Sequence, residues 1–214
     1  MDAKYKIVIV DDHDMFREGV KVLLGKSQKI EFIGEAVNGE EFLKLLKNVK
    51  PDVVLMDIAM PVMNGIEATS AAVKQSPDIK ILALSMFGEE EYYYKMIQAG
   101  VRGFVLKSSG IHELEHAIEE VVKGSSYFST ELLNYVLANI NDSKSENSGL
   151  DLSNEETNIL KLFTKSMSDE EIAKEVNIKH AEVDTIRKNL MKKTGCNNTA
   201  SLVMFAIKNK IVSI

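Results

Sequence analysis

The chain has 214 residues, 45% of them hydrophobic and 27% charged, which are proportions of a globular protein in water. No apolar run approaches the roughly 18 residues that a bilayer-spanning helix needs, and the N-terminal residues show no secretory pattern. The single cysteine, Cys196, excludes an intramolecular disulfide framework and a cysteine-based zinc cluster. We therefore expect a cytoplasmic protein that makes no contact with a membrane.

The net charge of −6 is distributed unevenly along the chain. Residues 1–124 carry 15 basic and 20 acidic side chains, residues 125–149 carry 1 and 3, and residues 150–214 carry 10 and 9. This asymmetry predicts an acidic front domain, a linker and a near-neutral rear domain, and only the rear domain has a charge balance suited to phosphate backbones.

Residues 1–124 alternate between short apolar runs and stretches with helical spacing of apolar residues. The runs at 6–10, 30–36, 53–57, 80–85 and 103–107 predict five strands. The stretches at 14–25, 38–49, 65–75, 89–99 and 111–123 predict five helices. Such alternation is typical of an α/β fold, here a doubly wound parallel sheet with flavodoxin-like strand order.

Polar side chains stand where four of these strands end. They are Asp11 and Asp12, then Asp57, Ser85 and Lys107. In a flavodoxin-like sheet the four strand ends are neighbours, so these side chains converge on one pocket. Clustered carboxylates favour a hard divalent cation such as Mg²⁺, while a lysine and a serine hydroxyl suit phosphoryl oxygens. The set predicts a site at which an aspartate is phosphorylated.

The loop after residue 57 contains Pro61 and the pair Asn64-Gly65. Proline cannot continue a strand ladder, and glycine tolerates positive φ. We expect a turn here, with the freedom of Gly65 used for its backbone conformation.

On these residues the front domain resembles the receiver domain of two-component response regulators. The resemblance implies that Asp57 accepts a phosphoryl group from a sensor histidine kinase. It also implies roles for the neighbouring residues, with Mg²⁺ held by Asp12, Asp57, the backbone carbonyl of Ala59 and, through water, Asp11; phosphoryl oxygens held by Ser85 and Lys107; and a conformational switch formed by Ser85 and Phe104.

Behind the front domain, residues 125–149 form the predicted linker. Apolar residues at helical spacing predict a helix over 130–140, and the Ser-rich stretch 141–149 has the composition of a flexible segment. Residues 150–214 then show helices only. Ser153 and Ser168 each precede a glutamate by three residues, which is the capping-box pattern of a helix start.

A short helix after Ser168, a turn at 177–179 and a longer helix over 180–194 follow the helix-turn-helix plan, and a fourth helix is expected over 198–209. This all-α rear domain resembles the four-helix DNA-binding domain of the NarL/LuxR/FixJ class, which implies binding to double-stranded DNA with two half-sites by a homodimer formed on phosphorylation. By position, DNA contacts are expected from Asp184, Thr185 and Lys188 toward bases and from Lys179, Lys192 and Lys193 toward phosphates.

Three positions depart from that class. Glu170 and Asp184 stand where members often carry lysine, and Ile186 stands where they often carry histidine. An acid cannot neutralise a phosphate, although it can accept a hydrogen bond from cytosine N4. An alternative is therefore a receiver whose acidic recognition helix binds a protein instead of DNA.

A second alternative is a hydrolase that passes through an aspartyl phosphate. The sequence weighs against an enzyme, because no second acid or base is positioned after Asp57 and the rear domain has no substrate-pocket residues. The favoured interpretation is a two-component transcription regulator whose only chemistry is its own phosphorylation and dephosphorylation.

Overall fold

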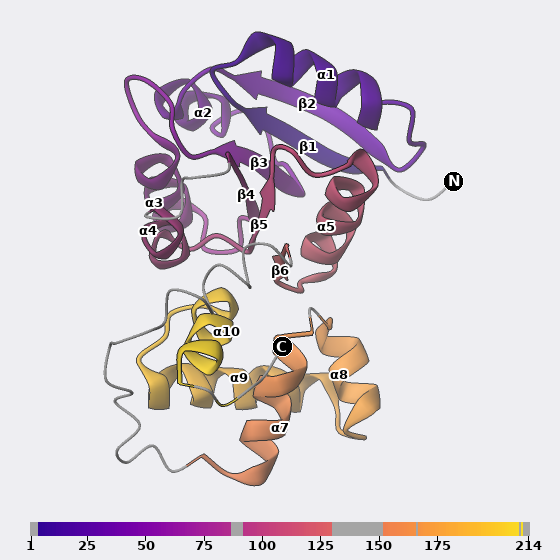
Figure 1. The fold of residues 1–214 in the computed structure, drawn as a ribbon, viewed down its shortest axis with the longest axis vertical. Helices are drawn as coiled ribbons and strands as arrows, with labels where there is room; N and C mark the ends of the chain where they lie inside the picture. The colour runs from indigo at the N-terminus through magenta and orange to yellow at the C-terminus, as the bar shows by residue number, and fades with distance from the viewer. Residues whose placement is uncertain (1–3, 87–91, 130–151, 166, 210, 212–214) are drawn as a thin grey trace.

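The computed structural model describes residues 4–86, 92–129, 152–165, 167–209 and 211, and it divides into a sheet domain above and a helical domain below in Figure 1. The elements are β1 (Tyr5–Val10), α1 (Asp14–Leu24), β2 (Ile30–Ala36), α2 (Gly39–Leu45), β3 (Val53–Asp57), α3 (Gly65–Gln75), β4 (Ile81–Ser85), α4 (Tyr93–Ala99), β5 (Gly103–Leu106), α5 (Ile111–Lys123), β6 (Tyr127–Phe128), α7 (Asn154–Phe163), α8 (Asp169–Glu175), α9 (His180–Thr194) and α10 (Thr199–Lys208). None of the described helices is long and apolar enough to cross a bilayer.

The sheet has the strand order β2-β1-β3-β4-β5-β6, and every neighbouring pair is parallel. The predicted doubly wound α/β class is confirmed, and β1, β3, β4 and β5 are indeed neighbours. Because parallel strands end at a common edge, the polar residues at their carboxyl ends meet there.

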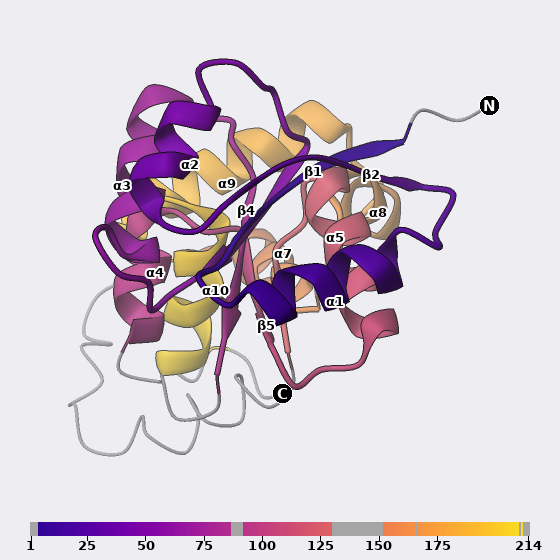
Figure 2. The same ribbon diagram turned by 90° about the horizontal axis from the view of Figure 1, so that it is seen from above.

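Helices cover both faces of the sheet. Figures 1 and 2 show α1 and α5 on one face and α2, α3 and α4 on the other. Alternate residues of each central strand serve the two layers, as a strand's period of two requires. In β1, for example, Ile9 packs in the cluster that holds α1 and α5, and Val8 packs in the cluster that holds α2, α3 and α4.

Several boundaries differ from the sequence prediction. The sheet has a sixth strand, because residues 127–128 pair with β5 beyond the expected domain boundary at 124. A two-residue strand is too short to leave a periodic signal. Helix α2 ends at Leu45, before residue 49, and α4 begins at Tyr93. The predicted helix over 130–140 lies outside the described residues.

The loop after β3 uses its glycine differently from the expectation. The positive φ, 69°, belongs to Val62, whereas Gly65 is the first residue of α3. A Cβ added at Gly65 would stand 2.0 Å from the backbone oxygen of Asp57. The glycine is needed because α3 begins directly against the end of β3, which holds the Asp57 backbone in place.

The helical domain contains the predicted helix-turn-helix. Capping boxes begin α7 at Ser153 and α8 at Ser168, each closed by the glutamate three residues later. Between α8 and α9 the turn passes through Asn177, whose φ is 55°, a value that asparagine tolerates better than most residues. Helix α9 ends at Gly195 with φ 73°.

The two domains touch through the end of α4 and the start of α10. The side-chain amide of Asn198 donates to the carbonyl of Ile97 at 2.9 Å, and that of Asn197 donates to the carbonyl of Gln98 at 3.3 Å. Asn198 also caps α10, accepting from the N–H of Ser201. One side chain thus starts a helix of the rear domain and contacts the last turn of a helix of the front domain.

Candidate functional site

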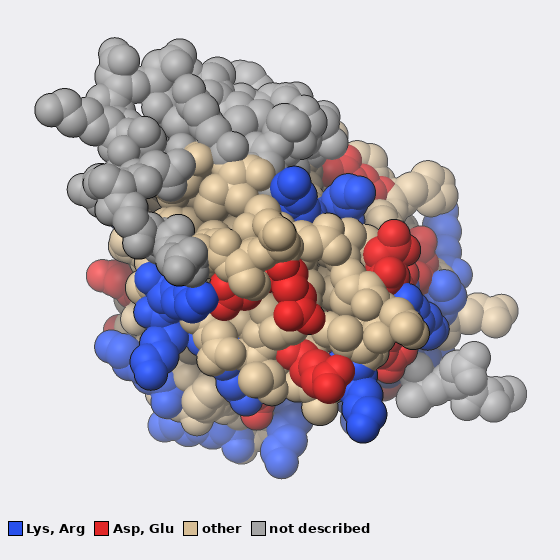
Figure 3. Space-filling view, turned by 90° about the horizontal axis from the view of Figure 1, so that it is seen from below, with Lys and Arg blue, Asp and Glu red and all other residues tan. Residues whose placement is uncertain are grey.

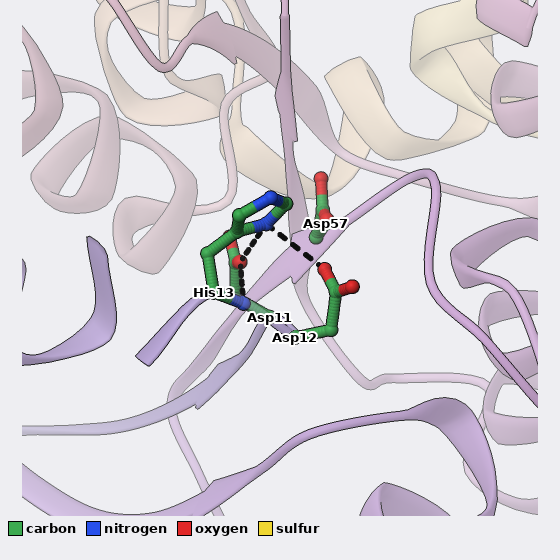
Figure 4. A group of neighbouring side chains, drawn as sticks. All are labelled: Asp11, Asp12, His13 and Asp57. Atoms are coloured by element: carbon green, nitrogen blue, oxygen red, sulfur yellow. Dashed lines mark hydrogen bonds and ion pairs between the residues drawn. The ribbon is translucent and has the colours of Figure 1, made fainter. Parts of the chain in front are cut away.

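Three carboxylates and one imidazole meet at the carboxyl edge of the sheet. Ligand atoms of Asp11, Asp12, His13 and Asp57 all lie within 4.8 Å of one another. Figure 4 shows the side chains from the end of β1 facing Asp57 at the end of β3. Asp11 and Asp57 are buried, Asp12 is half-buried and His13 is exposed. The arrangement places buried negative charge at the carboxyl edge of the sheet, next to an exposed imidazole.

Lys107 supplies the cation that holds this cluster together. It follows β5, and its Nζ lies 2.8 Å from both Asp11 Oδ2 and Asp57 Oδ1. Burial alone would lower the pKa of Lys107, but the two ion pairs raise it, so the lysine stays charged. The ammonium also lies 5.0 Å from the centre of the Phe16 ring, which closes the α1 side of the site.

Asp57 has an environment unlike that of a surface carboxylate. Burial raises its pKa to about 6, against the lowering effect of Lys107 and of the Ile58 N–H, and the charge on Asp11 adds to the rise. Both of its recorded polar contacts, from Lys107 and from Ile58, reach the same oxygen, Oδ1. Within the described part of the chain no contact to Oδ2 is recorded, so that oxygen is the one available to react.

His13 was not singled out from the sequence, although the structure places it in the cluster. Its Nδ1 lies 3.0 Å from Asp12 Oδ1 and 3.3 Å from Asp11 Oδ1, and its backbone N–H donates to Asp11 Oδ1 at 2.9 Å. The ring sits beside the two carboxylates from the solvent side (Figure 4). Its position directly after the pair of aspartates was the only available signal.

The donor set fits a hard divalent cation. Three carboxylates face one lysine, and Lys107 contacts only two of them, so negative charge remains in excess. Carboxylate and carbonyl oxygens are the ligands that Mg²⁺ prefers. Ala59, two residues after Asp57, is exposed, and in the part of the chain that the structure describes no backbone N–H donates to its carbonyl.

The predicted switch residues lie in one buried group with a tyrosine that the sequence analysis missed. The Ser85 hydroxyl at the end of β4 lies 3.5 Å from the hydroxyl of Tyr93, the first residue of α4. The Tyr93 ring packs edge-on against Phe104, with ring centres 5.3 Å apart. Phe104 in turn stacks on Phe128 of β6 at 6.3 Å. Phe104 has no hydroxyl, and the neighbouring tyrosine places one beside Ser85.

The side chains expected to contact DNA lie on or beside α9. Thr185 donates its hydroxyl to the carbonyl of Ala181, and Lys188 pairs with Asp184 at 2.8 Å. Asp184 and Lys188 line a cavity shared with α3 and α4 of the front domain. The structure therefore brings two of the three side chains expected to contact bases, Asp184 and Lys188, against the other domain.

The three lysines expected to contact phosphates have different surroundings. Lys179 precedes α9 and Lys192 is exposed in its last turn, whereas Lys193 pairs with Glu156 of α7 at 2.7 Å. Figure 3, which views the molecule from below, shows basic side chains gathered along one rim and acidic ones nearer the centre. The face has mixed charge, as the near-neutral balance of residues 150–214 predicted.

Two family models match the chain. The response regulator receiver domain matches residues 7–119, and the luxR family of bacterial regulatory proteins matches residues 150–206. The two matches fall on the sheet domain and on the helical domain respectively.

Relatives match along the whole length. The oxygen regulatory protein NreC of Staphylococcus aureus (strain bovine RF122 / ET3-1) is 34% identical, with 97% of this chain and 99% of NreC covered. The transcriptional regulatory protein DegU of Brevibacillus brevis is 30% identical, with 100% and 97% covered. Among solved structures, a LuxR-family two-component response regulator from Aurantimonas sp. SI85-9A1 is 32% identical with a TM-score of 0.59, over 62% of this chain and 94% of that one.

Proposed function

Since this chain belongs to the bacterial response regulators that join a receiver domain to a LuxR-type DNA-binding domain, we propose that phosphorylation of Asp57 controls its binding to DNA. The observation that carries the proposal is the placement of Asp57. Its carboxylate is buried among two others and lies 2.8 Å from Lys107, so it combines a nucleophilic oxygen with a cation for the incoming phosphoryl group. The proposed domains are residues 1–124, extended by β6, and residues 150–214, joined by a linker.

The donor is a phosphohistidine of a sensor kinase. Oδ2 of Asp57 attacks the phosphorus, the new P–O bond forms as the P–N bond breaks, and the histidine nitrogen leaves. Lys107 holds a phosphoryl oxygen as a point charge, and the Ser85 hydroxyl donates to another. Asp12, Asp57 and the Ala59 carbonyl would hold Mg²⁺, with Asp11 acting through water. When bound, the cation offsets the negative charge of the carboxylates and the phosphoryl group.

The signal reaches the rear domain through α4. When the Ser85 hydroxyl turns toward the phosphoryl group, it loses its contact with the hydroxyl of Tyr93. Tyr93 is the first residue of α4, and its ring then changes its packing against Phe104. The last turn of the same helix carries the carbonyls that accept from Asn198 and Asn197. A shift of α4 by part of a turn breaks those hydrogen bonds and frees α9, which shifts the population toward a DNA-binding dimer.

A first experiment combines acetyl phosphate labelling with DNA binding. The full chain is incubated with acetyl phosphate and Mg²⁺, and incorporated phosphate is measured on a phosphate-affinity gel. Binding to duplexes selected from a random library is then measured by fluorescence anisotropy at several salt concentrations. We expect the wild type to gain phosphate, to double in mass by light scattering and to bind DNA with a steep salt dependence.

Two variants supply the controls. Asp57→Asn should gain no phosphate and stay at the resting DNA affinity, whereas Glu31→Gln, which removes an exposed carboxylate of the same domain, should behave as wild type. Labelling of Asp57→Asn would contradict the assignment of the acceptor. Phosphorylation of the wild type without any salt-dependent DNA binding would favour the alternative in which the acidic recognition helix, with Asp184, binds a protein.

A further inference from the structure

A cavity of about 440 Å³ lies between the two domains, away from Asp57. The front domain lines it with α3, α4 and the turn before β5, and the rear domain lines it with α9 and the turn that follows. Its volume is within the range of small-molecule sites in proteins. Because neither domain encloses it alone, anything bound there contacts both.

The lining of this cavity is strongly positive. Four of its side chains are cationic, Lys74, Arg102, Arg187 and Lys188, and only Asp184 is a carboxylate. Asp184 is already shared, since it lies 2.8 Å from Lys188 Nζ and 3.6 Å from an Nη1 of Arg187. The cavity thus holds more positive charge than its own acid can neutralise.

Arg102 is a half-buried cation that the front domain contributes to this cavity. It stands just before β5, and its backbone N–H donates to the carbonyl of Ile81. No hydrogen bond or ion pair of its side chain is recorded among the described residues. Burial lowers its pKa, and the charge of Asp78 opposes this without forming an ion pair with it. A guanidinium does not deprotonate under these conditions, so a partly desolvated charge remains without a counter-ion.

Arg187 faces the same cavity from the rear domain. It pairs with Asp169 through Nη2 and lies 5.1 Å from the centre of the Phe163 ring, which fixes the plane of its guanidinium. Its Nε is buried and has no hydrogen-bond partner. Burial, and then the charge of Arg102, lower its pKa to about 10. The two arginines therefore repel each other across the domain boundary.

We propose that this cavity binds a small anion carrying phosphoryl groups, held between Arg102 of the receiver domain and Arg187 of the DNA-binding domain. Guanidinium groups form paired hydrogen bonds to phosphoryl oxygens, so the anion replaces a repulsion with two charge-assisted contacts. A ligand that bridges the domains stabilises the arrangement in which they touch. Since Asp184 and Lys188 line the same cavity, the ligand also opposes DNA binding, and this consequence alone rests on the proposed function.

Titration calorimetry of the full unphosphorylated chain with inorganic pyrophosphate tests the site. The buffer is stripped of divalent cations and held at constant ionic strength, so that neither phosphorylation nor general screening contributes. We expect one saturable site per chain. Arg102→Gln should weaken binding at least tenfold, and Lys50→Gln, which removes one exposed positive charge of the same domain, should leave it unchanged.

Further variants separate this site from the others. Binding should persist in Asp57→Asn, because the acceptor pocket is not involved. Arg102→Lys, which keeps the charge and loses the planar fork, should bind with intermediate affinity, and small-angle scattering should show a smaller radius of gyration for the wild type with pyrophosphate than without.

Three results would overturn the proposal. The first is the absence of saturable binding to the wild type, and the second is equal affinity in a folded Arg102→Gln. The third is loss of binding in Lys192→Gln/Lys193→Gln while Arg102→Gln still binds, which would assign the anion to the expected DNA-contacting lysines. Citrate binding as tightly as pyrophosphate would overturn the assignment to phosphoryl groups.

Discussion

The two domains handle charged side chains in opposite ways. In the receiver, two buried carboxylates share one lysine, and burial raises the pKa of Asp57 to about 6. In the helical domain, Glu156 closes a capping box and pairs with Lys193, and these contacts lower its pKa. In the first arrangement, burial disfavours the charged form of a carboxylate at the place where a phosphoryl group would arrive. In the second, hydrogen bonds and an ion pair favour the charged form and stabilise the helices. Removing the charge of Asp57 should therefore raise the free energy of unfolding at neutral pH, whereas removing the charge of Glu156 should lower it.

The largest effect is expected when the receiver loses its cation. Lys107→Ala leaves Asp11 and Asp57 buried without the cation that they share, and breaking a buried ion pair from one side costs about 3–5 kcal/mol. The free energy of unfolding is measured by urea denaturation in buffer free of Mg²⁺, with hydrogen exchange of the β1 and β3 amides to identify the receiver transition.

Lys29→Ala is the matched control, because Lys29 is 63% exposed and pairs with Glu119 on the surface. Its removal should cost much less than that of Lys107, because an exposed ion pair in water contributes little to stability. A similar decrease in the free energy of unfolding in both variants would mean that the ion pairs of the buried cluster contribute no more to stability than a surface pair does. Adding Asp57→Asn to Lys107→Ala should recover part of the lost stability, since one of the two unpaired charges is then gone.

A smaller effect of opposite sign is expected from Asp57→Asn in the wild-type background. The pKa of Asp57 is raised on folding from its ordinary value of 3.8 to about 6, so the folded state binds more protons between these values. Wild-type stability then falls as the pH rises from about 4 to 6, and the variant escapes this fall. At pH 7.5 the variant should be more stable by on the order of 2 kcal/mol.

The pH profile is the decisive measurement for this variant. Urea denaturation of both proteins from pH 4 to 8 without Mg²⁺ should give a difference in the free energy of unfolding that widens between about pH 4 and 6 and stays constant above pH 6. A constant difference over the whole range would assign the effect to packing and not to the titration of Asp57.

The sequence predicted features that follow from local pattern. Apolar runs located the strand ends, and strand order alone then brought Asp11, Asp57 and Lys107 together. Features that depend on tertiary contact were not predictable in this way. Tyr93 comes eight residues after Ser85 on another element, and only packing of α4 shows that the two hydroxyls meet.

Contacts between domains leave no signal in the sequence at all. Arg102 and Arg187 come from separate domains, and each has an ordinary local context. The role of Gly65 was predictable only in part. Its occurrence after Asn64 predicted a turn, but the need for glycine comes from the approach of α3 to the Asp57 carbonyl. Local pattern thus locates the site, and its electrostatic balance appears only with the fold.

The smallest effect is expected in the helical domain. Glu156→Gln keeps the capping-box hydrogen bonds, because glutamine also serves at that position, and removes the ion pair with Lys193. The lowered pKa of Glu156 means that its contribution is present above the ordinary value of 4.5 and is lost as the pH falls through the lower folded value. The variant should therefore be less stable at pH 7 by below about 1 kcal/mol and match wild type near pH 3. Hydrogen exchange of the α7 amides reports this change, and a loss at pH 7 that persists at pH 3 would contradict it. Asp57→Asn should gain stability at neutral pH and Glu156→Gln should lose it. The sign of the change in the free energy of unfolding therefore distinguishes a buried charge that destabilises the fold from a paired charge that stabilises it.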